Sequence, residues 1–158
     1  MKSIYYLTLL WTLSFSALST STVLTTMEDK AISRGEYVFD LGGCASCHTK
    51  DQSLAGGVEL VTPFGTFYGP NISPDFQYGI GGWTDNEFIK AMREGVSPEG
   101  EHYYPAFPYT SYINMSKQDL IDLKAYLDAQ DPVSESSLSH AVSFPFNQRG
   151  LLGLWKSI

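Results

Sequence analysis

The chain has 158 residues, a formal net charge of −7 at pH 7 and two cysteines. This length suits one domain with its own core. The negative charge argues against a nucleic-acid partner, because such a surface repels phosphate. Two cysteines that lie three positions apart cannot supply a disulfide framework, so the fold must be held together in another way.

The first 19 residues have the pattern of a secretory signal peptide. Lys2 supplies a positive charge, residues 4–18 form an apolar stretch, and small residues follow it. The stretch is shorter than the roughly 20 residues that a membrane-spanning helix needs. The sequence therefore predicts export to the periplasm. A retained anchor is the alternative, because the cleavage site is not a clean A-x-A, and membrane association is expected only in that case.

A polar lead-in at residues 20–32 precedes the first predicted helix. Ser33 and Glu36 have the spacing of a capping box, in which each side chain satisfies a backbone N–H group at the start of a helix. Apolar residues at helical spacing follow as far as Gly42. A short amphipathic helix is therefore expected to begin at Ser33.

The stretch GGCASCHTK directly after this helix contains Cys44 and Cys47, followed at once by His48. A disulfide within the pair would close a loop too short to stabilise the fold much. No βαβ pattern surrounds it, as a thioredoxin-like redox centre requires. The spacing favours a c-type haem attachment site, in which both thiols bond to the haem vinyl groups and the histidine binds iron.

Structural zinc is a weaker alternative for the same motif. Such a site needs four ligands, and only His102 and His140 are left to complete it. Both histidines are distant and irregularly spaced. Export also favours haem, because bacteria attach haem c outside the inner membrane.

Residues 50–82 are rich in Gly and Pro and show no sustained hydrophobic period. A run of that length without secondary structure needs something to pack on inside a compact domain. A flat apolar macrocycle would serve. The cofactor is therefore expected to form much of the core.

Two further helices are predicted in the second half of the chain. Thr84 and Glu87 form a capping box for one of them, and Gly95 ends it. Residues 116–119 repeat the capping pattern, and the helix that they start is expected to run to the Asp-Pro pair at 131–132.

Three residues near the second helix are candidates for contact with the haem. The indole N–H of Trp83 is a candidate donor to a haem propionate, with plain packing as the alternative. Arg93 is a weaker candidate, because a helical arginine beside a glutamate is more often solvated. His102 is expected to be a surface or packing residue rather than a second iron ligand.

This order of parts resembles the class I cytochromes c, all-α domains with few helices and long loops around one covalent haem. Gly35 and Phe39 in the first helix, and Tyr126 in the last, match the glycine and aromatic residues with which that family crosses its terminal helices. The resemblance implies an all-α haem domain at residues 33–130 and a C-terminal extension at residues 131–158.

A more specific similarity covers roughly residues 33–156. RGEYVFDLGGCASCHTK, TPFGTFYGPNISPD, GIGGWTDNEFIKAMREGVSPEG, YPAFPYTSYINMSKQDLIDLKAYL and PFNQRGLLGLWK look like the first haem domain of the cytochrome c subunits of bacterial periplasmic alcohol, gluconate and sugar dehydrogenases. Those subunits usually carry three haem domains, whereas this chain has one Cys-x-x-Cys-His. The resemblance therefore implies a mono-haem carrier or small subunit.

The likeness to small cytochromes c also implies a partner for His48. The dipeptide Gly69-Pro70 follows the attachment motif as a Gly-Pro does in those proteins. The Pro70 carbonyl is therefore expected to accept a hydrogen bond from the imidazole nitrogen that does not bind iron.

The sixth iron ligand that the resemblance implies is Met115. Class I cytochromes present a methionine from the loop before the last helix, which selects Met115 over Met27 and Met92. Some related domains carry a methionine where this chain has Phe107. A packing methionine, with the iron open or bound by His102, is the alternative.

These features together predict an electron-transfer protein rather than an enzyme. It would carry single electrons on one haem c, from a periplasmic dehydrogenase to a terminal oxidase or another cytochrome of the respiratory chain. A haem enzyme or a gas-sensing module is the alternative. Either would need an open sixth coordination position, against which a methionine ligand argues.

Overall fold

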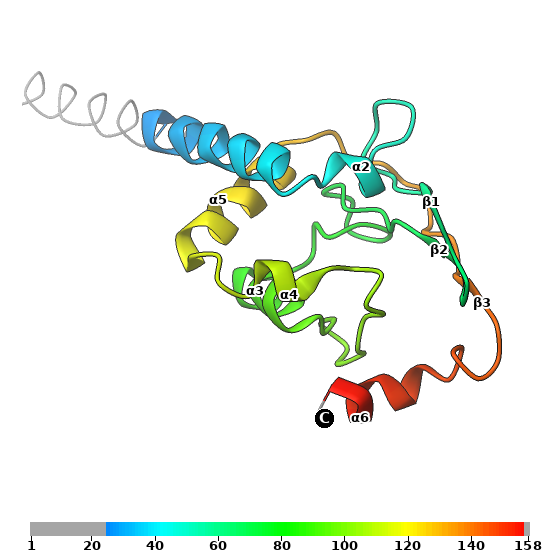
Figure 1. Ribbon diagram of the computed structural model, residues 1–158. Coiled ribbons are helices and arrows are strands. Elements are labelled where there is room, and N and C mark those ends of the chain that lie inside the picture. Colours follow the sequence, from blue (N-terminus) through cyan, green and yellow to red (C-terminus); the bar gives the residue numbers. More distant parts are fainter. Residues whose placement is uncertain (1–24, 157–158) are drawn as a thin grey trace, which may run out of the picture.

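The structure is a computed structural model and describes residues 25–156 (Figure 1). The predicted signal peptide lies outside the described residues. A first helix covers residues 25–41, and the later helical elements are α2 (Ala45–His48), α3 (Asp85–Glu94), α4 (Tyr109–Tyr112), α5 (Lys117–Asp128), the 3-10 turn η1 (Arg149–Leu151) and α6 (Leu152–Lys156). The strands β1 (Glu59–Thr62), β2 (Gly65–Tyr68) and β3 (Ala141–Val142) form an antiparallel sheet in that order. No helix in this range is both long and apolar enough to cross a membrane.

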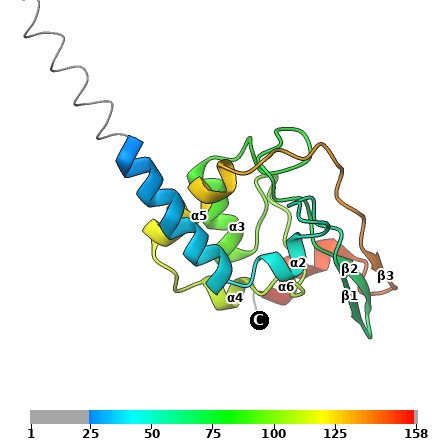
Figure 2. The same cartoon turned by 90° about the horizontal axis from the view of Figure 1, so that it is seen from above.

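The first helix crosses α5 at a glycine, and both helices lie side by side in Figures 1 and 2. A Cβ atom at Gly35 would lie 1.9 Å from the carbonyl oxygen of Asp122. No side chain other than hydrogen fits at this distance, so the glycine lets the two backbones touch. One turn further on, the rings of Phe39 and Tyr126 pack with their centroids 5.2 Å apart. The predicted crossing is therefore confirmed.

The hydrophobic core lies where α3 and α5 meet the first helix. It comprises Val38, Phe39, Ile80, Phe88, Met92, Leu120, Leu123 and Leu127. Leu120, Leu123 and Leu127 recur at helical spacing on one face of α5, as its sequence pattern predicts. This cluster fixes the positions of the loops that precede and follow α3.

Two of the three predicted helix starts are correct. Thr84 and Ser116 both form complete capping boxes, and Gly95 ends α3 in the left-handed conformation with a φ of 60°. The helix after Ser116 ends at Asp128, three residues before the predicted Asp-Pro stop.

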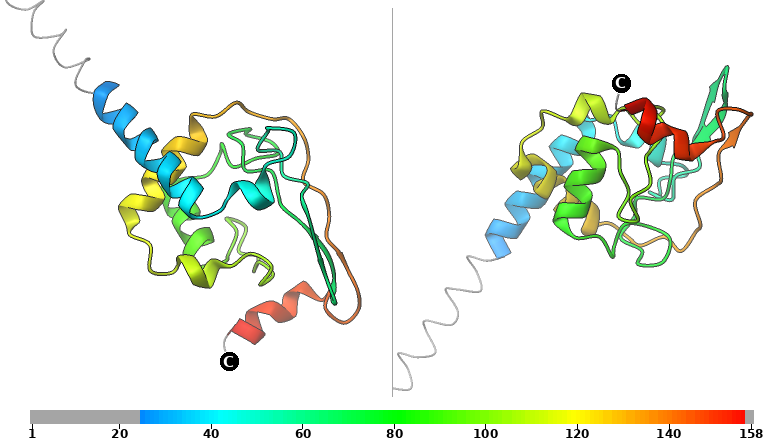
Figure 3. Two further views of the ribbon diagram at one scale, coloured as in Figure 1. Left: turned by 45° about the horizontal axis from the view of Figure 1, so that its top comes forward. Right: turned by 90° about the horizontal axis from the view of Figure 1, so that it is seen from below.

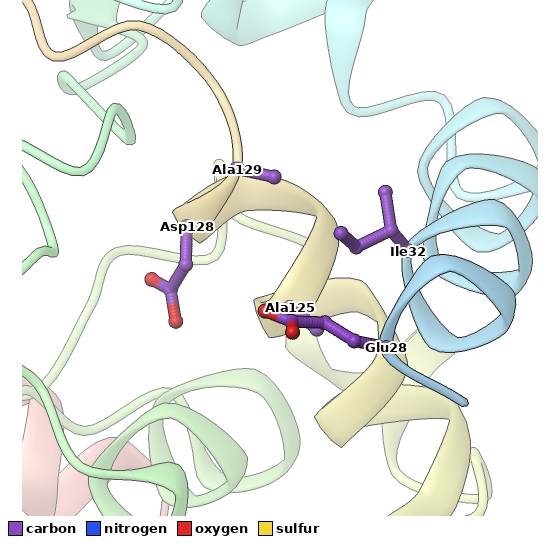
Figure 4. A pocket seen from close by; sticks show the side chains of 5 residues that line it. All are labelled: Glu28, Ile32, Ala125, Asp128 and Ala129. Carbon is purple, nitrogen blue, oxygen red and sulfur yellow. The ribbon is translucent and has the colours of Figure 1, made fainter. Parts of the chain in front are cut away.

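The prediction that the first helix begins at Ser33 is wrong. Residues 25–32 are already helical. In this part of the helix, Ile32 and Glu28 line a small pocket against Ala125 and Ala129 of the α5 end (Figure 4). The helix therefore includes residues upstream of the capping pattern, where residues 25–30 are exposed and Ile32 is half-buried.

The segment at 50–82 contains more structure than expected. β1 and β2 form a hairpin in it, with Thr62 paired to Gly65, and the Thr62 hydroxyl donates to the Gly65 carbonyl at 2.7 Å. All four residues of β1 are exposed or half-buried. Such a short strand shows no alternation of polar and apolar residues, which explains why the sequence pattern did not indicate it.

An ion pair joins the two crossing helices beside Gly35. Arg34 donates from Nε and Nη2 to the two carboxylate oxygens of Asp122, at 2.6 and 2.9 Å. Asp122 is 1% exposed and also accepts from the Gln118 amide. The hydrogen bonds from Arg34 are the largest cause that holds the pKa of Asp122 below its ordinary value. The carboxylate is therefore satisfied at neutral pH chiefly by the partner helix.

We expect Arg34→Met to lower the free energy of unfolding at pH 7, because it leaves a buried carboxylate without its main donor. A depressed pKa contributes stability above the pKa of the unfolded state, about 4, and this contribution is lost as pH falls through the folded pKa. The difference between variant and wild type should therefore shrink between pH 7 and pH 3. Urea titrations at several pH values measure it, and Lys30→Met on the same helix is the control. A deficit that is equal at both pH values would contradict this role of Asp122.

Candidate cofactor site

The attachment motif occupies a single helical turn. Gly43, with a φ of 66°, turns the chain out of the first helix, and α2 follows with Cys44 as its N-cap. Cys47 and His48 lie on that same turn. Both cysteines are free thiols. Burial raises the pKa of the Cys44 thiol to about 11, so this sulfur is protonated at neutral pH.

The imidazole of His48 is oriented by a backbone carbonyl. Its Nδ1 lies 2.8 Å from the carbonyl oxygen of Pro70. A carbonyl can only accept, so Nδ1 donates and Nε2 keeps its lone pair. Burial lowers the pKa of His48, against a smaller opposite effect of the Pro70 carbonyl, which favours the neutral ring. The side chain therefore has the tautomer that an iron ligand needs.

The Pro70 carbonyl is fixed by close backbone packing against the attachment turn. A Cβ atom at Gly69 would lie 1.8 Å from the carbonyl oxygen of Cys47. The Gly69 N–H donates to Val58 at 3.0 Å, and its carbonyl accepts from Gly57 at 2.8 Å. The His48 carbonyl accepts from the neighbouring Gly56 at 3.0 Å. These contacts join the 56–58 segment, the attachment turn and Pro70 into one unit.

Aromatic residues from the loop before α5 approach the attachment turn. The Tyr112 hydroxyl donates to the Gly42 carbonyl at 3.0 Å. Burial raises the pKa of Tyr112, and the charges of Cys44 and Cys47 add to the effect. The ring of Phe107 lies 5.7 Å from that of Tyr112. This loop therefore faces the same region as α2.

Met115 lies in this loop, half-buried against the core cluster. Its N–H donates to the Tyr112 carbonyl at 3.0 Å, and its own carbonyl accepts from Nη2 of Arg93. The backbone on both sides of this methionine is thus held, by α4 and by the end of α3. Trp83 also packs against the core cluster, immediately before the cap of α3.

The structure supports Arg93 as a contact of a haem propionate more strongly than the sequence does. Its Nε is buried, and the described residues offer it no hydrogen-bond partner. A buried guanidinium N–H needs an acceptor, and a carboxylate such as a haem propionate is its natural one. The sequence spacing does not indicate this buried donor, because an arginine in the last turn of a helix is usually solvated.

The other two histidines are placed apart from this turn. His140 accepts from the Tyr68 N–H at 3.2 Å and packs on Phe67, and His102 lies against the C-terminal helix at Gly153. Within residues 25–156, no three His, Cys, Asp or Glu side chains gather as a metal site would require.

The residues at α2 fit a covalently attached haem. Two free thiols and an imidazole with an available Nε2 lie on one turn, as the attachment chemistry requires. Half-buried apolar side chains pack against the same core cluster as Cys44, and they include Leu54, Ile72, Phe107, Tyr112 and Met115.

Comparison with known proteins identifies the class of protein. The cytochrome c family matches residues 32–131, and the chain belongs to that family. Membership implies covalent haem c and agrees with the predicted class I fold.

Individual relatives within this family are similar to the chain over most of its length. The chain is 53% identical over 131 residues to a diheme cytochrome c-type protein of Cereibacter sphaeroides, covering 78% of this chain and 44% of the relative. It is 42% identical over 128 residues to the cytochrome c subunit of a quinone-dependent alcohol dehydrogenase of Gluconacetobacter polyoxogenes, covering 79% of this chain and 27% of the relative. It is 38% identical over 161 residues to the gluconate 2-dehydrogenase cytochrome c subunit of Pantoea cypripedii, covering 100% of this chain and 35% of the relative. The chain thus spans less than half the length of these relatives, and it is a cytochrome c domain similar to electron-transfer subunits of dehydrogenases.

The close packing at Gly69 leads to a testable expectation. Gly69→Ala should destabilise the holoprotein by at least about 2 kcal/mol, because the methyl group overlaps the Cys47 carbonyl and neither backbone can easily move. It should also lower the yield of haem-bound protein. Thermal unfolding and the ratio of haem to protein absorbance measure both effects.

Gly82→Ala is the matched control, because a Cβ there meets only a Phe76 ring carbon at 3.8 Å. Equal stability and haem yield in the two variants would contradict the packing described for Gly69.

Proposed function

We propose that this protein carries single electrons on one haem c, in the periplasm, from a dehydrogenase to the respiratory chain. The observation that supports this most directly is the His48 imidazole, held by Pro70 with Nε2 free, on the same turn as two free thiols. The relatives that are cytochrome subunits of dehydrogenases support a dehydrogenase as donor. A terminal oxidase or another cytochrome is the proposed acceptor.

Each residue of the site has a part in this role. Bound haem supplies a one-electron couple between ferric and ferrous iron. Cys44 and Cys47 would hold the ring covalently, and His48, oriented by the Pro70 carbonyl, would bind the iron through Nε2. Trp83 and Arg93 are the proposed donors to the propionates. The half-buried apolar residues would keep water from bound haem, which would limit reorganisation when the charge at the iron changes.

Met115 is the proposed sixth ligand. Its loop is held by Arg93 and Tyr112, and Tyr112 in turn reaches the attachment turn. Methionine and histidine together raise the reduction potential, which suits a carrier that accepts electrons from a dehydrogenase. A filled sixth position also keeps small molecules off the iron, which a haem enzyme or a gas sensor would not do.

Covalent attachment is tested with Cys44→Ala combined with Cys47→Ala, in a host that exports the protein and attaches haem c. Wild-type protein should keep peroxidase-active haem through denaturing electrophoresis, and the double variant should lose it and fold poorly. Staining of wild type that disappears on boiling in detergent would overturn the proposed attachment.

Met115→Ala should lower the reduction potential, abolish the near-infrared sulfur-to-iron band and let carbon monoxide bind the ferrous protein. Met92→Leu, a change at a buried core position, should leave these three properties nearly unchanged.

Phe107→Met tests the alternative to Met115 ligation, in which the iron of the wild type has an open sixth coordination position near the Phe107 ring. A sulfur-to-iron band that appears only in Phe107→Met, together with rapid carbon monoxide binding by wild type, would reject Met115 as the ligand. It would also favour an enzyme or sensor over a carrier.

A further inference from the structure

The C-terminal extension runs over much of the domain instead of leaving it. The family match ends at residue 131. The chain beyond this point passes the 71–75 loop, pairs with the sheet as β3, and returns to the loop before α4 as α6 (Figures 1 and 3). It makes specific contacts at three places along this path.

The first contact is at Asn71, the residue after Pro70. Its amide Nδ2 donates to the carbonyls of Val133 and Glu135 at 2.8 and 2.9 Å, and its N–H donates to the Ser137 hydroxyl at 3.0 Å. Asn71 is 3% exposed. The extension thus supplies the hydrogen-bond partners of Asn71, and Asn71 follows Pro70, whose carbonyl orients His48.

The second contact joins the sheet to the loop after α3. His140 accepts from the Tyr68 N–H, and its ring packs 5.3 Å from Phe67 and 5.6 Å from Tyr104. The Phe67 and Tyr104 rings are themselves 5.2 Å apart. Three segments that are distant in sequence therefore share one aromatic cluster.

The third contact is made by η1 and α6. Arg149 donates to the His102 carbonyl at 3.0 Å, and a Cβ at Gly153 would lie 2.9 Å from the His102 Nε2. Lys156 donates to the carbonyls at the end of α3, at 2.8 Å to Glu94 and 2.7 Å to Gly95, and lies 4.1 Å from the Tyr109 ring centre. η1 and α6 thereby contact the segment 95–109 at Gly95, His102 and Tyr109.

This segment leads directly to the residues beside the thiols. The Tyr103 and Phe107 rings are 5.8 Å apart, and Phe107 packs in turn on Tyr112, which bonds to Gly42. The extension therefore contacts the backbone next to the His48 partner at one end and the loop that leads to Met115 at the other.

We infer that residues 133–156 form a strap that positions both sides of the haem site, the Pro70 side and the 95–115 loop. Gly153, Lys156 and Asn71 are positioning residues in this arrangement, because they act through the loops they hold. The inference rests on the proposed haem function and assigns a role to a part of the chain outside the family match.

The test compares Gly153→Val with Gly150→Val in the full-length holoprotein. A side chain at Gly153 meets the His102 ring, whereas a Cβ at Gly150 has nothing within 4 Å, so the two changes differ mainly in this contact. Gly153→Val should lower the reduction potential and speed carbon monoxide association to the ferrous protein several-fold. It should also speed amide hydrogen exchange in residues 96–109 several-fold. Gly150→Val should match wild type in all three.

Lys156→Met is the second variant, for the case in which Gly153→Val does not assemble. It removes the two hydrogen bonds to the end of α3 and should shift the same three properties in the same direction. Lys156→Arg, which keeps a donor at this position, should leave the three properties as in wild type. Lys90→Met, an exposed change on α3, is its control.

The outcomes separate this inference from the proposed function. Attached haem with an unchanged potential and carbon monoxide rate in both strap variants overturns the positioning role, even if hydrogen exchange rises. If wild type carries no covalent haem, the proposed function fails. In that case, amide hydrogen exchange of residues 96–109 still tests the strap. Exchange in Gly153→Val equal to that of wild type would overturn the strap, and faster exchange would support the conclusion that the strap holds this loop in place.

Discussion

The hydrogen bond from His48 to the Pro70 carbonyl is the interaction on which the rest of the site depends. It determines which imidazole nitrogen carries the proton, and hence which one is free. A single carbonyl can do this only if its own position is fixed. Gly69 provides that by letting the backbone before Pro70 touch the backbone of Cys47. The chemistry of the site is thus set by a contact between two backbone segments about 22 residues apart.

The same principle recurs elsewhere in the domain. At Gly35 two helices approach so closely that only hydrogen fits between them, and the ion pair of Arg34 and Asp122 lies next to this crossing. At Gly153 the C-terminal helix approaches a side chain rather than a backbone, since a Cβ there would lie 2.9 Å from the His102 Nε2. Close approach brings the flanking polar groups within hydrogen-bond distance. The domain therefore gains fixed geometry from positions that contribute no side-chain packing of their own.

The sequence predicted the parts of this structure that depend on local patterns. The capping boxes at Thr84 and Ser116 and the stop at Gly95 are determined by neighbouring residues, and all three are correct. The resemblance to cytochromes c placed Pro70 beside His48, and the structure has that hydrogen bond. The capping pattern at Ser33 failed: its sequence suits a helix start, yet the residues before it are already helical. The hairpin, the buried Nε of Arg93 and the path of residues 133–156 all depend on segments far apart in the chain, which spacing does not report.

The long separation between the crossing helices has a consequence for how the protein matures. Arg34 and Asp122 are 88 residues apart, so their helices meet only after a large loop has closed, which is entropically costly and slow. The attachment turn is synthesised well before α5. Burial in the finished fold raises the pKa of the Cys44 thiol to about 11, so little of the reactive thiolate is present there at neutral pH. Both thiols are therefore on a chain whose first helix and α5 have not yet met for as long as α5 has not been synthesised.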